Sequence, residues 1–304
     1  MAYLHSDREQ FRDAIDLAYE QTGVMVQAIE KDYYVTMLLR LLAQKMPYIV
    51  FKGGTSLSKC HKVIRRFSED IDITIDTLLS QGQKKKIKQA IVESAEELGM
   101  TIENLDETRS RRDYNRYVIA YDSVIPMASD ALKAAVLLET SYTAVSFPTV
   151  LLPVHSYIGD MMEQEAPDAI EEYNLNPFEM KVQGIDRTLA DKVFAVCDYY
   201  LQGKVAKHSR HLYDIYKLLP LVPQDENFRE LVKEVRAVRA QSVICPSALP
   251  EADVPELLEK IIREKAYKQD YDSLTTQLLE ENVPYDTVIA ALKKVAESSL
   301  FENN

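Results

Sequence analysis

The chain has 304 residues, of which 46% are hydrophobic and 28% charged, so it is long enough to bury one large core or two modest ones. Its 36 lysines and arginines against 48 aspartates and glutamates give a net charge of −12, which excludes a general nucleic-acid coat but allows a local basic patch. Its three cysteines lie far apart without a C-x-x-C pair, which argues against disulfides and structural zinc.

The beginning of the sequence shows no basic segment followed by an apolar one, so it predicts no signal peptide. No apolar run approaches the ~20 residues that a membrane helix needs. We therefore expect a cytoplasmic protein with no membrane partner.

The first residues predict two helices. Ser6 and Glu9 form a candidate capping box, and Gly23 is a candidate stop for the helix that follows it. A longer helix is expected over residues 25–45, where leucines recur at helical spacing.

The middle of the chain mixes short apolar runs typical of strands with periodic segments typical of helices. The expected strands are 48–51, 70–75, 114–121 and 131–142, and the expected helices are 55–64 and 83–98. The last two strands are expected to pair across a turn near residues 126–130.

After about residue 180 only helical periodicity remains. The expected helices are 188–202, 209–219, 228–243, 256–264 and 285–300. We therefore predict an α+β fold with a mixed sheet over residues 1–185, including the N-terminal helices, and a helical C-terminal domain over residues 186–304.

A pair of glycines and two hydroxyl residues, Gly53, Gly54, Thr55 and Ser56, follow the first expected strand. Glycines let a backbone approach a phosphate closely, and a following helix offers unpaired N–H groups. The alternative is an ordinary strand-to-helix turn. A Walker loop is excluded because the G-x-x-x-x-G-K-[ST] pattern is missing.

Two carboxylates, Asp70 and Asp72, alternate with isoleucines in the next expected strand. Strand alternation places both on one face, where they repel each other unless a cation or proton lies between them. With phosphate chemistry just upstream, the expected occupant is Mg²⁺ with a nucleoside triphosphate. The alternative is a D-x-D on a solvated strand.

The Gly-Gly turn, helix and D-x-D strand together resemble the polymerase-β-type nucleotidyltransferase fold, although the spacing from Gly54 to Asp70 is slightly longer than the commonest. That fold needs a third carboxylate on a neighbouring strand to hold two metal ions. Glu139, which ends the run AAVLLE, is our candidate. The alternative is that Glu139 only marks a strand end in water.

The resemblance becomes specific in five blocks that occur in order, and the chain is similar to the AbiEii family of nucleotidyltransferase toxins, which includes the MenT toxins. The blocks are EKDYY, FKGGTSLSK, RFSEDIDI, IDRTLADKVFA and RHLYDIYKL. These toxins belong to type IV toxin–antitoxin and abortive-infection systems. The resemblance therefore implies a cognate AbiEi-like antitoxin.

The resemblance also implies roles for individual residues. Gly53, Gly54, Thr55 and Ser56 would lie at the nucleotide phosphates with Lys59 nearby, Ser68 beside the site, and Asp70 and Asp72 on the metal. Lys192 would contact the triphosphate. Asp214 would accept a proton from the attacking hydroxyl or orient Lys192.

Without the resemblance, Lys192 and Asp214, which lie in expected helices, have simpler interpretations. Lys192 adjoins an apolar helix stripe, where a lysine commonly extends outward to solvent. Asp214 has Arg210 four residues earlier as a candidate partner. Basic clusters that are candidates for holding RNA phosphates contain Lys62, Arg65 and Arg66; Lys84 to Lys86 and Lys88; Arg109, Arg111, Arg112 and Arg116; and Lys204, Lys207 and Arg210.

These patterns predict an Mg²⁺-dependent enzyme that moves a nucleoside monophosphate from an NTP to an acceptor. The resemblance implies a tRNA 3′ end as acceptor and arrest of growth as the result. Two alternatives remain: a nucleotide-binding module that mainly contacts a partner, and the same transfer to a protein or small molecule.

Overall fold

The computed structural model describes residues 2–68, 70–126, 134–145 and 147–302. It divides the chain into two compact units. The first unit contains Met1–His61 and Ser68–Val182, and the second contains Lys62–Phe67 and Gln183–Asn304. The short segment between the glycine motif and the D-x-D strand thus belongs to the second unit.

Helix α1 (Arg8–Thr22) opens the first unit after a 3-10 turn, η1 (Leu4–Ser6). The predicted cap is wrong by one residue, because the side chain of Asp7 accepts hydrogen bonds from the backbone N–H groups of Glu9 and Gln10. The predicted stop is confirmed, since Gly23 ends the helix in the left-handed region at φ 69°.

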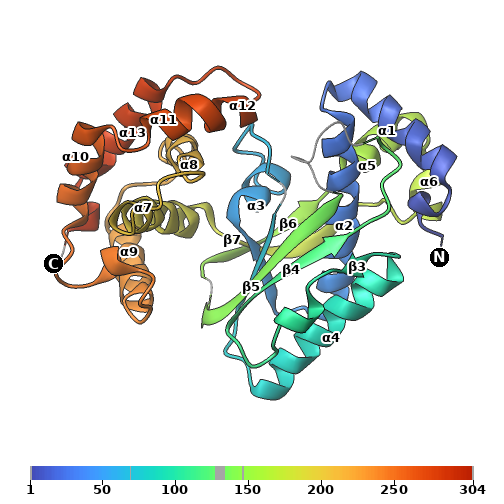
Figure 1. Ribbon diagram of the computed structural model, residues 1–304, viewed down its shortest axis with the longest axis horizontal. Helices are drawn as coiled ribbons and strands as arrows, with labels where there is room; N and C mark the ends of the chain where they lie inside the picture. Colours follow the sequence, from blue (N-terminus) through green and yellow to red (C-terminus); the bar gives the residue numbers. More distant parts are fainter. Residues whose placement is uncertain (1, 69, 127–133, 146, 303–304) are drawn as a thin grey trace. The chain divides into compact units, whose positions relative to one another are not determined.

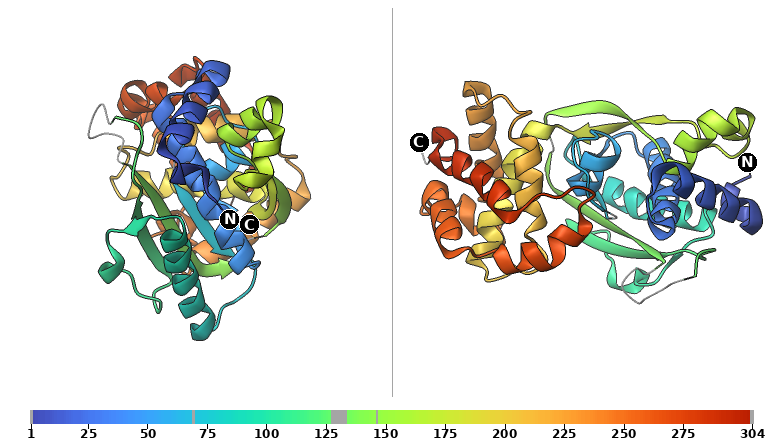
Figure 2. Two further views of the ribbon diagram at one scale, coloured as in Figure 1. Left: turned by 90° about the vertical axis from the view of Figure 1, so that its right-hand side faces the viewer. Right: turned by 90° about the horizontal axis from the view of Figure 1, so that it is seen from above.

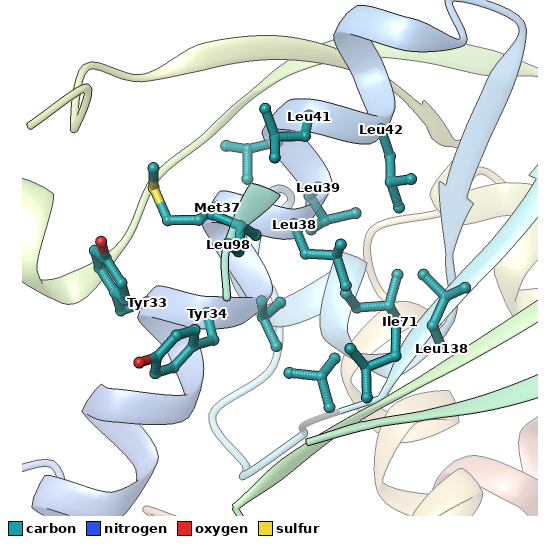
Figure 3. Packing of buried hydrophobic residues seen from close by; sticks show 14 of the residues in the cluster. Tyr33, Tyr34, Met37, Leu38, Leu39, Leu41, Leu42, Ile71, Leu98 and Leu138 are labelled. Carbon is teal, nitrogen blue, oxygen red and sulfur yellow. The ribbon is translucent and has the colours of Figure 1, made fainter. Parts of the chain in front are cut away.

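Helix α2 (Val26–Lys45) is the buried axis of the first unit, as predicted for residues 25–45. In Figure 3, Leu38 and Leu42 lie on the side of Ile71 and Leu138, whereas Tyr33 lies toward the other side of the helix. Because α2 is covered on several sides, its apolar residues form no single stripe.

The first unit holds a seven-stranded mixed sheet (Figure 1), with its strands in the order β3-β4-β5-β2-β1-β7-β6. The predicted strands are confirmed, with shifted ends, as β1 (Ile49–Lys52), β2 (Ile71–Ile75), β4 (Tyr114–Ala120) and β5 (Ala135–Val145). Strands that the sequence analysis missed are β3 (Thr101–Ile102), β6 (Thr149–Val154) and β7 (Phe178–Gln183). The turn predicted near residues 126–130 falls mostly outside the described residues.

Helix α3 (Gly53–Lys59) connects β1 toward β2 and is shorter than predicted, because it starts at the glycine pair and ends at Lys59. Helix α4 (Gln81–Glu97) is closed by a capping box of Ser80 and Gln83. A 3-10 turn, η2 (Leu105–Glu107), follows β3. Helices α5 (Tyr157–Glu165) and α6 (Pro167–Glu172) were not predicted, and α5 packs beside α1 (Figure 2).

The sheet has two chemically different faces. Ile71, Ile73 and Ile75 of β2 belong to the core that contains α2 and α4. Because strand side chains alternate, Asp72 points to the opposite face. We call this opposite face of β2 and its neighbours the carboxylate face.

The second unit is helical, as predicted. Its main helices are α7 (Ile185–Leu201), α8 (Arg210–Leu218), α9 (Glu226–Arg239), α10 (Val254–Glu264) and α13 (Tyr285–Glu297). Shorter elements are η3 (Pro246–Ala248), α11 (Lys268–Asp270), the π-helical η4 (Tyr271–Thr275), α12 (Thr276–Leu278) and η5 (Ser299–Phe301). Helix α8 packs on both α7 and α13. Among the described residues, no helix combines the length and apolar character required to cross a membrane.

Candidate functional site

Two carboxylates lie side by side on the carboxylate face. Strands β2 and β5 are parallel neighbours, and their register places Asp72 directly beside Glu139. The same register pairs Ile71 with Leu138, both of which point into the core. The hydrophobic burial of this second pair fixes which way the carboxylates point, because a one-residue slip would turn the acids inward.

The surroundings of Glu139 leave part of its charge uncompensated. Burial raises the pKa of Glu139, and the neighbouring charges of Asp72 and Asp70 raise it further. Tyr114 of β4 hydrogen-bonds to this carboxylate, and Arg116 approaches it at 3.7 Å but is about half exposed. The face therefore favours the approach of an additional cation.

Gly53 is required by the shape of this site. Its φ of 79° lies in the left-handed region, where a side chain strains the backbone. A Cβ at this position would overlap the Asp72 carboxylate and lie 2.8 Å from its Cγ. The glycine therefore allows the carboxylate of β2 to lie directly against the start of α3.

The hydroxyl residues of α3 have different environments. Thr55 and Ser68 share a hydrogen bond of 2.9 Å between their hydroxyl groups. Ser56 is fully buried and donates to the Gly53 carbonyl, so its hydroxyl stabilises the turn. Gly54 is also buried. Thr55 and Ser68 are thus brought together as predicted neighbours, while Ser56 faces inward.

Lys59, predicted near the phosphates, is instead buried at the far end of α3. Its ammonium forms an ion pair with Asp32 of α2 and donates to the His155 carbonyl. Asp32 also accepts from the backbone N–H of Tyr157, at 3.0 Å. These contacts make Lys59 an anchor between α3 and the helices behind it.

The donor chemistry of the carboxylate face suits Mg²⁺, which prefers oxygen ligands. The raised pKa of Glu139 reflects repulsion that a cation would relieve. Across the described parts of the chain, no three carboxylate, imidazole or thiolate groups already form a metal cluster. The Asp72–Glu139 pair nevertheless fits, because Mg²⁺ is usually held by one or two carboxylates together with waters and substrate phosphates.

The second unit holds another charged site, in which Lys192 of α7 and Asp214 of α8 form an ion pair of 2.7 Å. Both side chains are buried, with 9% and 0% of their surface exposed. Burial lowers the pKa of Lys192, against the effect of Asp214, which raises it. The outward-pointing alternative for Lys192 is therefore wrong.

The partner of Asp214 is Arg66 rather than Arg210. The Arg66 Nε and Nη2 atoms donate to the two carboxylate oxygens at 2.7 and 2.8 Å. Burial alone would raise the pKa of Asp214, but the Arg66 guanidinium and the Lys192 ammonium hold it well below its usual range. Lys192 also contacts His211 Nδ1 at 3.3 Å, and burial lowers the pKa of His211 far below its ordinary value.

Several predicted basic clusters are partly used by the fold. Arg66 is buried against Asp214, and Lys84 forms an ion pair with Asp113. Lys88 and Arg109 donate to backbone carbonyls of the loop that contains Thr108. These side chains stabilise loops and are poorer candidates for RNA contacts than the sequence suggested.

Four residues near these sites were missed or misassigned. Tyr114 and Arg116 point to the carboxylate face. The sequence feature that could have identified them is their alternation in a strand predicted next to Glu139. Arg66 was assigned only to a basic cluster, and His211 was given no role. No local signal connects Arg66 with Asp214, since 148 residues separate them.

A comparison with protein-family models identifies the family of this chain. The model described as nucleotidyl transferase AbiEii toxin, type IV TA system, matches residues 36–291, which is most of the chain. In a comparison with curated proteins, no protein matches this chain. The family match confirms the predicted resemblance and the nucleotidyltransferase fold. The chain therefore belongs to the AbiEii family of nucleotidyltransferase toxins.

Proposed function

We propose that this protein transfers a nucleoside monophosphate from an NTP to the 3′ end of a tRNA and releases pyrophosphate. The observation that carries the proposal is the carboxylate face, where Asp72 lies in register with Glu139 and against Gly53. Paired carboxylates beside a close-approach glycine are suited to hold a cation and a triphosphate together.

In this proposal the Asp72–Glu139 pair would hold Mg²⁺, and Asp70, whose charge also acts on Glu139, would supply a third carboxylate when the ion binds. When bound, the ion neutralises phosphate charge and makes the attacking hydroxyl more acidic. Tyr114 holds the Glu139 carboxylate through its hydrogen bond. Gly53 and Gly54 allow the phosphates to reach the backbone at the start of α3.

Four further residues of the first unit have supporting roles. Thr55 and Ser68 exchange their mutual hydrogen bond for contacts with phosphate oxygens. Lys59, bound to Asp32, keeps α3 in place. Ser56 supports the glycine turn through its bond to the Gly53 carbonyl.

In the second unit, Lys192 binds the triphosphate and stabilises the charge that develops on the pyrophosphate leaving group. Its ammonium is a compact donor with three N–H bonds, of which the described contacts with Asp214 and His211 use two. The remaining donor is available to a phosphate oxygen.

The proposal has consequences for the cell. Modified tRNA cannot be aminoacylated at its blocked end, so translation and growth stop. An AbiEi-like antitoxin controls the toxin, and both act in the cytoplasm in response to infection. These partners follow from the family resemblance, since type IV systems pair a toxin with an antitoxin.

The direct test incubates purified protein with each of the four labelled NTPs, Mg²⁺ and total cellular RNA. We expect label from one preferred NTP on tRNA, and none with the Asp70→Ala variant or after chelation of Mg²⁺. Label on protein would instead establish the alternative acceptor. No label on any macromolecule would favour the partner-binding module.

A growth test checks the biological role independently. Expression of the wild-type chain without an antitoxin should stop bacterial growth, whereas Asp70→Ala and Lys192→Ala should relieve the arrest at equal protein levels. Equal toxicity of all three proteins would show that the harm does not depend on this chemistry.

A further inference from the structure

Arg66 makes a complete set of contacts inside the second unit. Its Nε and Nη2 atoms bind the two oxygens of Asp214, and its Nη1 atom donates to the Phe67 carbonyl at 3.1 Å. Only 1% of its side chain is exposed. A planar guanidinium in this bidentate geometry fixes both the position and the orientation of the carboxylate.

The backbone on either side of Arg66 is held in the same unit. The Arg65 N–H donates to the Tyr213 hydroxyl at 3.0 Å, and the Arg65 carbonyl accepts from the Glu280 N–H at 3.0 Å. The Phe67 N–H donates to the Leu278 carbonyl at 2.9 Å. These hydrogen bonds fix the backbone on both sides of Arg66, and the contacts of its guanidinium hold the side chain against Asp214.

The contacts of Asp214 limit what its carboxylate can do. One oxygen accepts from Arg66, and the other accepts from both Arg66 and Lys192. With no exposed surface and with both oxygens engaged by cations, this carboxylate is a poor acceptor for a substrate proton.

We propose that Arg66 is a positioning residue, which holds Asp214 as a fixed buried anion so that Asp214 orients the Lys192 ammonium. Asp214 then acts as an anchor and not as the general base of the transfer. The inference rests on the proposed function only in assuming that Lys192 binds the NTP triphosphate.

The first experiment measures Lys192 directly and needs no turnover. Competitive acetylation followed by mass spectrometry gives the reactivity of each lysine in the folded chain. We expect Lys192 to react slowly in the wild type and severalfold faster in Arg66→Met and in Arg66→Lys, since lysine keeps the charge but not the two-pronged geometry. Unchanged Lys192 reactivity in both folded variants would overturn the proposal.

Arg239→Met is the matched control. Arg239 is another mostly buried arginine of the second unit, and it binds Asp191 and Asp198 of α7, the helix that carries Lys192. Its loss tests whether loosening α7 is enough to expose the lysine. We expect Arg239→Met to lower stability and leave Lys192 acetylation at the wild-type level; an equal rise in Arg66→Met and Arg239→Met would overturn a specific role for Arg66.

The second experiment separates nucleotide use from acceptor use. In Arg66→Lys we expect kcat/KM for the NTP to fall about 10- to 100-fold, as for other residues that orient a functional group, with KM for tRNA unchanged. A similar change in both KM values would indicate general loosening and would contradict the proposal. Because Arg66→Lys retains the buried charge, it tests the idea even if Arg66→Met does not fold.

The third measurement addresses Asp214 itself. The pH profile of kcat should keep its acidic limb in Asp214→Asn, with lower activity throughout, because an anchor does not titrate in the reaction. Loss of an acidic limb in Asp214→Asn would identify a general base and overturn the inference. If no acceptor is ever labelled but Lys192 acetylation and equilibrium NTP binding still respond to Arg66, the proposed function fails and this inference stands.

Discussion

The carboxylate face of the first unit and the Lys192–Asp214 cluster of the second unit differ in how far their acidic groups are neutralised by neighbouring cations. On the carboxylate face, Asp72 and Glu139 are like charges in register, and Arg116, which approaches Glu139 at 3.7 Å, is about half exposed. In the cluster, the single anion Asp214 is buried between Arg66 and Lys192.

This difference separates a site that needs a ligand from one that is already assembled. Repulsion between carboxylates is relieved when a cation binds, so the first site gains stability from its ligand. A buried ion pair is compensated by its own partners, and its arrangement persists without a ligand. Each prediction below tests one side of this contrast.

The largest expected effect is on catalysis at the carboxylate face. Asp72→Asn removes a proposed metal ligand, and the transfer rate should fall about 10³-fold. This factor corresponds to the several kcal/mol by which a metal ion stabilises charge in the transition state. Stability should not fall, because the variant also removes like-charge repulsion. Labelled NTP transfer and urea unfolding measure the two effects.

Asp76→Asn is the control for this variant. Asp76 directly follows β2, and its carboxylate is paired with Lys181. We expect nearly wild-type transfer from Asp76→Asn. Comparable loss in both variants would show that any acid near β2 matters, and the metal assignment of Asp72 would then fail.

The second prediction concerns stability of the cluster. Asp214→Leu leaves Arg66 and Lys192 buried without their anion, and the free energy of unfolding should fall by about 3–5 kcal/mol. The exposed pair of Lys268 and Asp272 offers the control, and Asp272→Ala should cost at most about 0.5 kcal/mol. A small loss in Asp214→Leu, measured by urea denaturation, would contradict a tightly compensated cluster.

The third prediction uses two glycines that share a left-handed backbone. Gly53→Ala should cost roughly 1–2 kcal/mol for its positive φ and also displace the Asp72 carboxylate, so transfer activity should fall sharply. Gly23→Ala has a similar φ of 69° but nothing within 4 Å of the added Cβ. Gly23→Ala should therefore lose stability alone, and retained activity in Gly53→Ala would count against the close approach to Asp72.

The smallest effect is a pH dependence in the second unit. Burial and the nearby charges of Lys192, Arg210 and Arg66, opposed by Asp214, hold the pKa of His211 below its unfolded value near 6.5. The unfolded state therefore binds the proton first as the pH falls below about 6.5. Stability is present above that pH and is lost below it, by at most about 1.4 kcal/mol per pH unit.

His211→Gln should flatten this slope when urea unfolding is measured between pH 7 and pH 5. His155→Gln serves as the control, since His155 lies in the first unit, where its Nδ1 atom contacts Asp160 at 2.9 Å. Equal slopes in the wild type and His211→Gln would mean that His211 is not held neutral by the fold.

The predictable part of the fold came from local patterns. Alternation placed Asp72 opposite Ile71 and Ile73, and helical spacing gave α2 and the main helices of the second unit. Strand β3 was missed because two residues are too few to show a period, and β6 because its proline argues against a strand. Strand β7 was missed although its residues alternate between apolar and polar. The cap of α1 was misplaced because Ser6 and Asp7 are both good N-cap residues, and only the backbone conformation selects Asp7.

Of the candidate sites, the acidic residues were predictable from the sequence, but several of their neighbours were not. Glu139 was chosen because one neighbouring strand had to supply a third acid, and the register places it beside Asp72. Tyr114 was missed because strand alternation gives the face to which it points but not the carboxylate that its hydroxyl reaches. The prediction that Lys59 lies at the phosphates did not anticipate Asp32, which lies 27 residues earlier on another helix.

The sequence by itself determined the family, the alternation of the D-x-D strand and the left-handed glycine that ends α1, because periodicity and turn chemistry depend on neighbouring residues. Only the tertiary structure decided which charges meet. Arg66 reaches Asp214 across 148 residues, and Ser56 turns inward to the Gly53 carbonyl. A buried charge takes whichever partner folding brings within reach, and the cost of leaving it unpaired then makes that partner part of the structure.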